Sequence, residues 1–188
     1  MLSERIQTLS PSLTIAITML AQDLKASGKD VLSFSAGEPD FDTPRRIKDE
    51  AIKAINEGFT RYTAVPGIIE LREAIVGKLK RDNNLDYAPS DIIASNGAKH
   101  SLFNLFQAVI NPGDEVIIPA PYWVTYPELV KYAFGVPVYI ETDEISGFKI
   151  TPEQLKTAIT AKTKMIILTT PSNPTGSIYS REELEALG

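Results

Sequence analysis

Hydrophobic residues follow two different periods along this 188-residue chain. The helical period is clearest between residues 68 and 83, where a long amphipathic helix is predicted by Ile68, Ile69, Leu71, Ile75 and Leu79. From Ser90 onward, short apolar runs alternate with helical segments. Because strands joined through helices form right-handed crossovers, this alternation predicts an α/β fold with a mostly parallel central sheet and helices on both faces.

Capping and turn residues set the expected bounds of the elements. Strands are expected over residues 31–35, 91–94, 115–118, 136–141 and 164–169. Helices are expected over residues 11–27, 44–58, 68–83, 99–109, 122–132 and 152–159, with a last one beginning after residue 180. Ser10 is the expected N-cap of the first helix, before Pro11, and residues 1–9 form an extended arm. Two capping boxes are expected, Thr151 with Gln154 and Ser180 with Glu183.

Composition narrows the range of partners. The 43% hydrophobic content allows a sizeable core, and the formal net charge of -5 argues against a nucleic-acid partner. The chain has no cysteine, which removes disulfides and thiolate metal sites and fits a reducing compartment, so we expect a cytoplasmic protein. Its one histidine, His100, argues against a histidine-based metal site. The apolar residues 15–20 are too few to span a membrane, and we expect no signal peptide.

The loop at residues 95–100 combines the features of an anion site. Gly97 lets a ligand approach the backbone closely. The helix expected after it presents free N–H groups and a positive dipole end, where each favourable anion contact contributes ~0.3–1 kcal/mol. Lys99 can add a full positive charge. The loop matches neither the Walker A pattern nor G-x-G-x-x-G, so it predicts an anion cradle of another kind, or else a turn with a solvated lysine.

Two further loops, each directly after a predicted strand (a strand exit), are stiffened by prolines. Residues 119–123 carry Trp123, the single tryptophan, which can stack on an aromatic cofactor for roughly 0.5–1.5 kcal/mol or can pack in the core. Residues 171–176 present the amide of Asn173 at the carboxyl edge of the sheet, where ligands bind in open α/β folds, although such a loop can also be a plain connection. An anion cradle, an aromatic face and an amide together suit a flat, polar, phosphorylated cofactor.

This combination resembles the class I aminotransferases of the pyridoxal-phosphate fold-type I superfamily, and most of all their bacterial aspartate aminotransferase branch. The resemblance extends over the whole chain. Five motifs in the family's order carry it, at residues 35–41, at Tyr62 with residues 67–72, and at residues 96–99, 121–124 and 172–176. The resemblance implies that residues 1–43 form an N-terminal arm and part of a small domain, and that residues 44–188 begin the large cofactor-binding domain.

The resemblance implies pyridoxal 5′-phosphate as cofactor and assigns residues to it. Gly97, Ala98 and Lys99, at the start of a helix, are implied to hold its phosphate. Trp123 is implied to stack on the pyridine ring, and Asn173 to hydrogen-bond the ring hydroxyl. Tyr62 is implied to reach the phosphate of the neighbouring subunit, which makes the family a homodimer.

The same resemblance implies an amino-group transfer between an amino acid and a 2-oxo acid. Gly37 is implied to contact the substrate α-carboxylate through its backbone. Asn173 is implied to help bind the substrate carboxylate, and Trp123 to be among the substrate-binding residues. Lys99 occupies a position where relatives in this branch meet the distal carboxylate of aspartate or glutamate. Acidic amino donors are therefore expected, with prephenate and aromatic substrates as the alternatives.

No catalytic residue of the family is found within residues 1–188. The family's Schiff-base lysine, in a Ser-x-Ser-Lys setting, follows the Asn-Pro-Thr-Gly loop together with an Asp, a Tyr and two Arg residues, and this sequence stops at Gly188. We therefore expect a truncated chain, marginally folded and inactive alone, because its sheet lacks the later strands.

Two other functions remain open on the sequence. One is a noncatalytic phosphate-ligand-binding or interaction module that ends naturally at Gly188. The other is a related fold-type I lyase or synthase. Extending the reading frame past Gly188 separates the enzyme from the module, and substrate assays separate the enzymes from one another.

Overall fold

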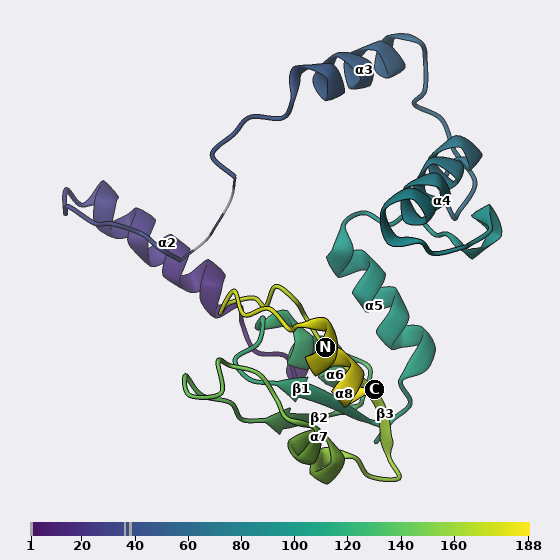
Figure 1. The fold of residues 1–188 in the computed structure, drawn as a ribbon. Helices are drawn as coiled ribbons and strands as arrows, with labels where there is room; N and C mark the ends of the chain where they lie inside the picture. Colours follow the sequence, from purple (N-terminus) through teal and green to yellow (C-terminus); the bar gives the residue numbers. More distant parts are fainter. Residues whose placement is uncertain (1, 36, 38) are drawn as a thin grey trace. The chain divides into compact units, whose positions relative to one another are not determined.

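The computed structural model describes residues 2–35, 37 and 39–188. The chain divides into two compact units, one formed by Met1–Ser35 with Leu102–Gly188 and the other by Ala36–Ser101. Figure 1 shows their helices and strands in chain order. The predicted division near residue 43 concerns the domains of the complete family fold, and it stays a prediction.

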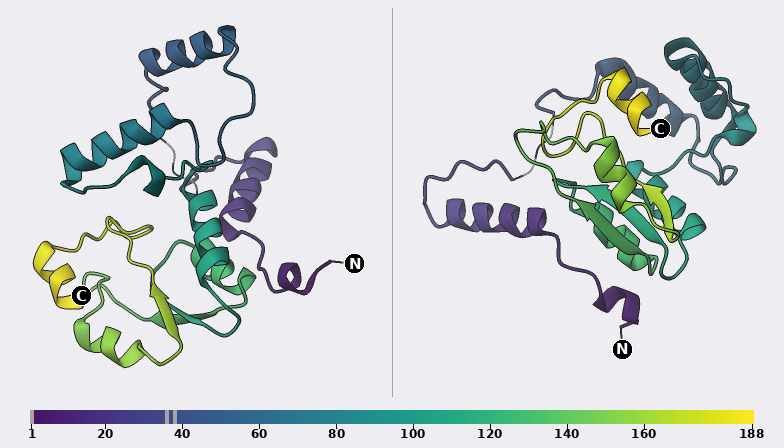
Figure 2. Two further views of the ribbon diagram at one scale, coloured as in Figure 1. Left: turned by 90° about the vertical axis from the view of Figure 1, so that its right-hand side faces the viewer. Right: turned by 60° about the horizontal axis from the view of Figure 1, so that its bottom comes forward.

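A three-stranded parallel sheet lies at the centre of the first unit. Its strands are β1 (Glu115–Pro119), β2 (Val136–Ile140) and β3 (Thr163–Ile166), in the order β2-β1-β3. β1 pairs with β2 in continuous register and with β3 across an irregularity between Glu115 and Val116. The predicted parallel sheet with helical crossovers is therefore confirmed, and Figure 2 gives two further views of it.

Helices cover both faces of this sheet, as the sequence predicts. The helices are α5 (Ala98–Val109), α6 (Thr125–Tyr132), α7 (Pro152–Ala158) and α8 (Arg181–Leu187). Side chains alternate along β1, so Val116 and Ile118 pack with α5 and α6 on one face, whereas Ile117 packs with α7 on the other. All three side chains are at most 1% exposed. β1 is thus the buried centre of two hydrophobic clusters.

The first unit also contains two N-terminal helices, and the second unit is mainly helical. The first two are α1 (Glu4–Gln7) and α2 (Leu13–Ala26); the second unit has α3 (Arg45–Asn56), α4 (Ile69–Asn83) and the 3₁₀ turn η1 (Pro89–Asp91). α4 confirms that a helix forms over the predicted residues, but Ile69 and Leu71 of its apolar face are exposed. Arg72 of α4 donates to the carbonyls of Gly67 and Pro89, at 3.2 and 3.0 Å, and so ties the helix to the segments before and after it.

The predicted N-terminus was wrong in two respects. Residues 1–9 are not an extended arm throughout, because α1 forms a single turn within them. The next helix begins two residues later than predicted, with Ser12 as its N-cap; the Ser12 hydroxyl accepts a hydrogen bond from the N–H of Ile15. Either serine could cap a helix, and the local sequence did not distinguish them.

Two predicted strands, 31–35 and 91–94, do not form. Within the described part of each segment the backbone has no strand partner, and Leu32 and Phe34 are 84% and 95% exposed. In the second segment, Ala94 donates one backbone hydrogen bond to Pro66, at 2.9 Å. A strand exists only by exchanging hydrogen bonds with a neighbour, so an apolar run alone is insufficient.

The remaining boundaries agree with the predictions to within a few residues. Both capping boxes are confirmed: Thr151 with Gln154 at the start of α7, and Ser180 with Glu183 at the start of α8. Among the helices that the structure describes, none is long and apolar enough to cross a membrane.

Replacing Gly135 with alanine tests the packing around the end of α6. A Cβ at Gly135 would lie 2.8 Å from Cγ2 of Ile110 and 3.1 Å from the carbonyl oxygen of Asp114. We expect Gly135→Ala to lower the free energy of unfolding by about 1–3 kcal/mol, because this part of the core has no room for a methyl group.

Gly77→Ala in α4 is the matched control, because a Cβ there meets nothing within 4 Å. Its expected effect is a gain of up to about 1 kcal/mol from helix propensity. Urea denaturation measures both variants. Equal midpoints for the two would contradict this description of the core.

Candidate active site

A small cavity lies where the chain leaves β1 and β3. It is lined from one side by Pro119, Pro121 and Tyr122 and from the other by Thr169 and Asn173. Its volume is about 20 Å³, room for about one water molecule, so it cannot enclose a pyridine ring. The cavity by itself is therefore at most the floor of a candidate site.

The strand order explains why a cavity forms at this edge. β1 and β3 are neighbours, but the chain leaves β1 toward α6 and leaves β3 toward α8. α6 packs in the cluster on one face of the sheet, and Leu187 of α8 packs against the cluster on the other. Such a reversal opens a crevice at the carboxyl ends of the strands, which is where open α/β folds bind ligands.

Aromatic residues form the β1 side of this site. Trp123 is half-buried and packs against the cluster that contains α6, and its ring meets Tyr126 edge-on, with centroids 5.5 Å apart and planes at 89°. Tyr122 stacks on Tyr139 of β2, with ring centroids 5.2 Å apart. Burial, followed by the hydrogen bond with Tyr139, raises the pKa of the Tyr122 phenol. Trp123 itself does not line the cavity, whereas its neighbour Tyr122 does.

Asn173 forms part of the opposite side. Its side chain is exposed, and among residues 2–35, 37 and 39–188 the structure gives its amide no hydrogen-bond partner. The loop around it is closed by two backbone hydrogen bonds between neighbours, from Ser172 to Ser177 and from Gly176 to Ser172, at 2.9 and 2.8 Å. The peptide bonds before Pro171 and Pro174 are cis, as is the one before Pro121. An amide held on an ordered loop is available to a ligand.

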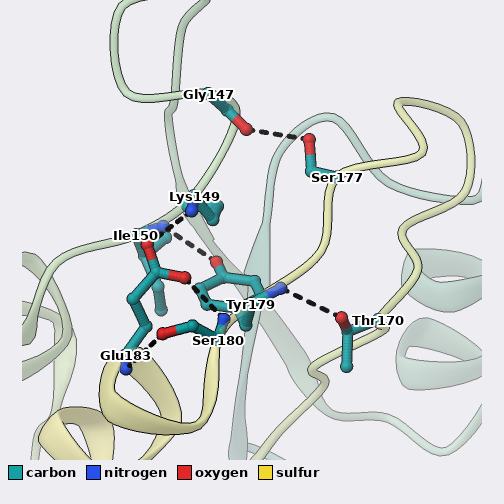
Figure 3. A network of polar contacts seen from close by, with 8 residues as sticks. All are labelled: Gly147, Lys149, Ile150, Thr170, Ser177, Tyr179, Ser180 and Glu183. Atoms are coloured by element: carbon teal, nitrogen blue, oxygen red, sulfur yellow. Dashed lines mark hydrogen bonds and ion pairs between the residues drawn. The ribbon is translucent and has the colours of Figure 1, made fainter.

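A network of polar contacts fastens the end of this loop to the segment before α7 (Figure 3). The hydroxyl of buried Tyr179 accepts a hydrogen bond from the N–H of Ile150, at 2.9 Å, and the Tyr179 N–H donates to Thr170 at 3.1 Å. Lys149 forms an ion pair with Glu183, which also closes the capping box of α8. These contacts hold the whole segment between β3 and α8 in place.

The predicted anion cradle belongs to the second unit. Gly97 has a φ of +80°, which glycine adopts without strain, and a Cβ there would meet nothing within 4 Å. α5 begins directly after it, at Ala98, and Ala98 and Lys99 are exposed. His100 is exposed as well, and its Nδ1 accepts a hydrogen bond from the N–H of Asn96 at 3.1 Å. An open glycine before an exposed helix start has the geometry that a phosphate requires.

The other two predicted site residues also lie in the second unit and are exposed. Tyr62 lines an open groove together with Phe59, Arg61 and Ile69. Gly37 has open space around its Cα, whereas its motif neighbours Ala36 and Glu38 lie outside the described residues. The described contacts do not test the roles assigned to Tyr62 and Gly37, which stay predictions.

Tyr126 and Tyr179 are among the cavity residues that sequence reasoning missed. Tyr126 follows Trp123 by three positions, and residues at that spacing meet on a helix, so the helical period contained a signal for it. Tyr179 carries no comparable signal, because its contacts with Ile150 and Lys149 depend on the tertiary fold.

Comparison with known proteins gives the family. The model of the family "Aminotransferase class I and II" matches residues 29–188. The chain belongs to this family. It is 58% identical to an aspartate aminotransferase of Geobacillus stearothermophilus and 56% identical to an aspartate/prephenate aminotransferase of Nitrosomonas europaea, in each case over all of this chain. The predicted aminotransferase resemblance is therefore confirmed.

Solved structures agree with this assignment. Aspartate aminotransferase from Thermus thermophilus with maleate superposes on the whole chain with a TM-score of 0.95 at 48% identity. The chain spans about half the length of the curated relatives it matches, 48% of the Geobacillus protein and 47% of the Nitrosomonas protein. The fold-type I aminotransferase fold is confirmed over the region that they share.

Aspartate aminotransferases depend on pyridoxal 5′-phosphate, and the residues present here fit that group. The exposed amide of Asn173 has no protein partner among the described residues, which leaves it able to bond a ring hydroxyl. The open space at Gly97 admits a phosphate close to the backbone. Each feature, taken by itself, suits one part of such a group: the amide suits the ring hydroxyl, and the helix N–H groups suit the phosphate.

The ion pair of Glu183 predicts a pH-dependent stability. The hydrogen bond from Lys149, followed by that from the Ser180 N–H, lowers the pKa of Glu183 below its ordinary value. A carboxyl with a lowered folded-state pKa stabilises the fold above its unfolded pKa, near 4.3, and this contribution is lost as pH falls through the folded value.

We therefore expect Glu183→Gln to unfold at a lower urea concentration than the parent at pH 7. The difference between the two proteins should shrink as pH is lowered below about 4. Glu185→Gln, on the same helix, is the control. A difference that stays constant from pH 7 to pH 3 would contradict the stabilising role of the Glu183 carboxylate.

Proposed function

We propose that the protein is an aminotransferase that moves an amino group between aspartate or glutamate and a 2-oxo acid, with pyridoxal 5′-phosphate as cofactor. The observation that carries the proposal is the position of Asn173. It lies at a crevice between two strand exits, exposed and without a protein partner in the described chain, within a family of aminotransferases.

Residues around the crevice would orient the cofactor ring. Pyridoxal phosphate, when bound, supplies an electron sink that allows the α-proton of an amino acid to leave. Trp123 would pack on the ring face, where its own edge contact with Tyr126 keeps it oriented. Asn173 would donate its amide N–H to the ring hydroxyl, and so favour the ionised form of that hydroxyl.

Residues of the second unit would hold the charged groups. The N–H groups that follow Gly97, at Ala98 and Lys99, would bind the phosphate at the start of α5, where the helix dipole favours an anion. The backbone of Gly37 would bind the substrate α-carboxylate. The ammonium of Lys99 would bind the distal carboxylate of an acidic substrate, which gives it a role in substrate choice.

A homodimer is part of the proposal. Tyr62 is fully exposed on an open groove lined by both apolar and charged side chains, and such a side chain is suited to contact a second copy and its cofactor phosphate. We also propose a cytoplasmic location, which the absence of cysteine supports.

Removing the amide of Asn173 tests the site. In the protein encoded by the complete reading frame, Asn173→Ala should weaken cofactor binding roughly ten- to hundred-fold, because a hydrogen bond to a charged group contributes about 1.5–3 kcal/mol. Titration of the cofactor absorbance measures the dissociation constant and also the expected shift in the spectrum. Asn56→Ala, on exposed α3, is the control, and an Asn173→Ala protein with the parental spectrum and affinity would contradict the assignment.

The charge of Lys99 tests the substrate class. Lys99→Met should raise KM for aspartate about ten-fold or more while leaving KM for alanine nearly unchanged, because only aspartate has a distal carboxylate. Steady-state assays with 2-oxoglutarate as acceptor measure both constants, and Lys156→Met on α7 is the control. Equal losses for the two donors would remove Lys99 from substrate recognition.

Prephenate is the second candidate acceptor. The Nitrosomonas europaea relative, at 56% identity, is named an aspartate/prephenate aminotransferase, which favours testing this acceptor beside 2-oxoglutarate. Amino transfer from aspartate to each acceptor would decide between them. Cofactor binding without transfer to either would instead support a noncatalytic module or a related lyase.

A further inference from the structure

We propose that Tyr126 is a positioning residue. It would fix the position of Trp123 relative to the segment leading to Asn173, on the opposite side of the crevice. The inference rests on the proposed function, because it concerns the two side chains that would orient the cofactor ring. Tyr126 would not touch the reacting atoms. Its role would be exerted through its neighbours on the two strand exits.

Tyr126 contacts both sides of the crevice. Its hydroxyl lies 2.8 Å from Oγ1 of Thr169, on the segment that follows β3. Its ring meets the ring of Trp123 edge-on at 5.5 Å, and its N–H donates to the Trp123 carbonyl at 3.0 Å. One side chain on α6 is therefore bonded to the β3 exit and packed against the β1 exit.

The hydroxyl is what makes this contact directional. Tyr126 is only 9% exposed and packs in the hydrophobic cluster formed with Phe106 and Val130. A phenylalanine would fill the same volume, but it would leave the position of the β3 exit to less specific packing. A buried hydroxyl requires a partner, and here Thr169 is that partner.

The contact acts close to the base of the Asn173 loop. Thr169 lies four residues before Asn173, and the adjacent Thr170 accepts the N–H of Tyr179 at 3.1 Å. The start of the loop is thus held by Tyr126 through Thr169 and by Tyr179 through Thr170. Loss of the first contact would free the segment toward the crevice while the second stays in place.

The experiment removes the same hydrogen bond from either end. Tyr126→Phe and Thr169→Val, singly and together, are made in the protein encoded by the complete reading frame. Each single variant should weaken cofactor binding about three- to ten-fold. The double variant should bind the cofactor no more weakly than the single variants do, because all three lack the same hydrogen bond. The circular dichroism of the bound cofactor should change in the same way in all three.

A second readout needs no cofactor. Amide hydrogen exchange in the cofactor-free protein should accelerate about three-fold or more in peptides covering residues 170–176 in all three variants. Tyr132→Phe, on the same helix, and Thr157→Val, which loses a bond to the Glu153 carbonyl within α7, are the matched controls. Both controls should retain the parental exchange and affinity.

The outcomes separate this inference from the proposed function. If the variants unfold at lower urea but keep the parental cofactor affinity, dichroism and loop exchange, Tyr126 is only a core residue and the inference is overturned. If Tyr126→Phe fails to fold, Thr169→Val alone decides by the same readouts. If Asn173→Ala leaves cofactor binding unchanged, the proposed function itself fails, and the inference about its site fails with it.

Discussion

The burial of β1 on both faces is the constraint on which the first unit depends. Val116 and Ile118 face one helical layer and Ile117 faces the other, and all three are removed from solvent. A strand buried on both sides requires helices on both faces, and parallel neighbours require crossover connections. The helices α6 and α7 are those connections. The two helical layers and the strand order are therefore determined together.

The same constraint creates the crevice. α6 and α8 lie on opposite faces of the sheet. The segments that leave the carboxyl ends of β1 and β3 therefore run toward opposite faces, with a crevice between them. The prolines of both exits make these segments stiff, and tyrosines hold them from two directions. Tyr126 bonds Thr169 from α6, and Tyr179 bonds Ile150 on the other side of the sheet. A stiff exit held at its base can present one amide or one ring to a ligand.

In the second unit, local sequence accounts for more of the structure than packing does. α4 follows from its own apolar period, and its Arg72 contacts tie it to the neighbouring segments. Gly97 and the start of α5 form a local feature that needs only a left-handed glycine before a helix. Such a feature can be predicted from the sequence because its geometry involves few residues, all of them close together in the chain.

Much of the fold could be predicted where one short segment contains the whole physical cause. The capping boxes at Thr151 and Ser180 are examples, because side chain and backbone meet within three residues. The β1–β3 alternation is another, since its apolar runs and turns repeat. The predictions at residues 31–35 and 91–94 were wrong because a strand also needs a hydrogen-bonding neighbour, and no local pattern supplies one.

The sequence by itself determined the alternation of helices and strands, the family, and the positions of Gly97, Trp123 and Asn173 within their motifs. The resemblance already assigned Trp123 and Asn173 to one cofactor, but only the tertiary structure decided that Tyr126 spans the crevice between their segments. The reason is the distance along the chain. Tyr126 and Thr169 are 43 residues apart, and a contact of that separation depends on the order in which the strands pair.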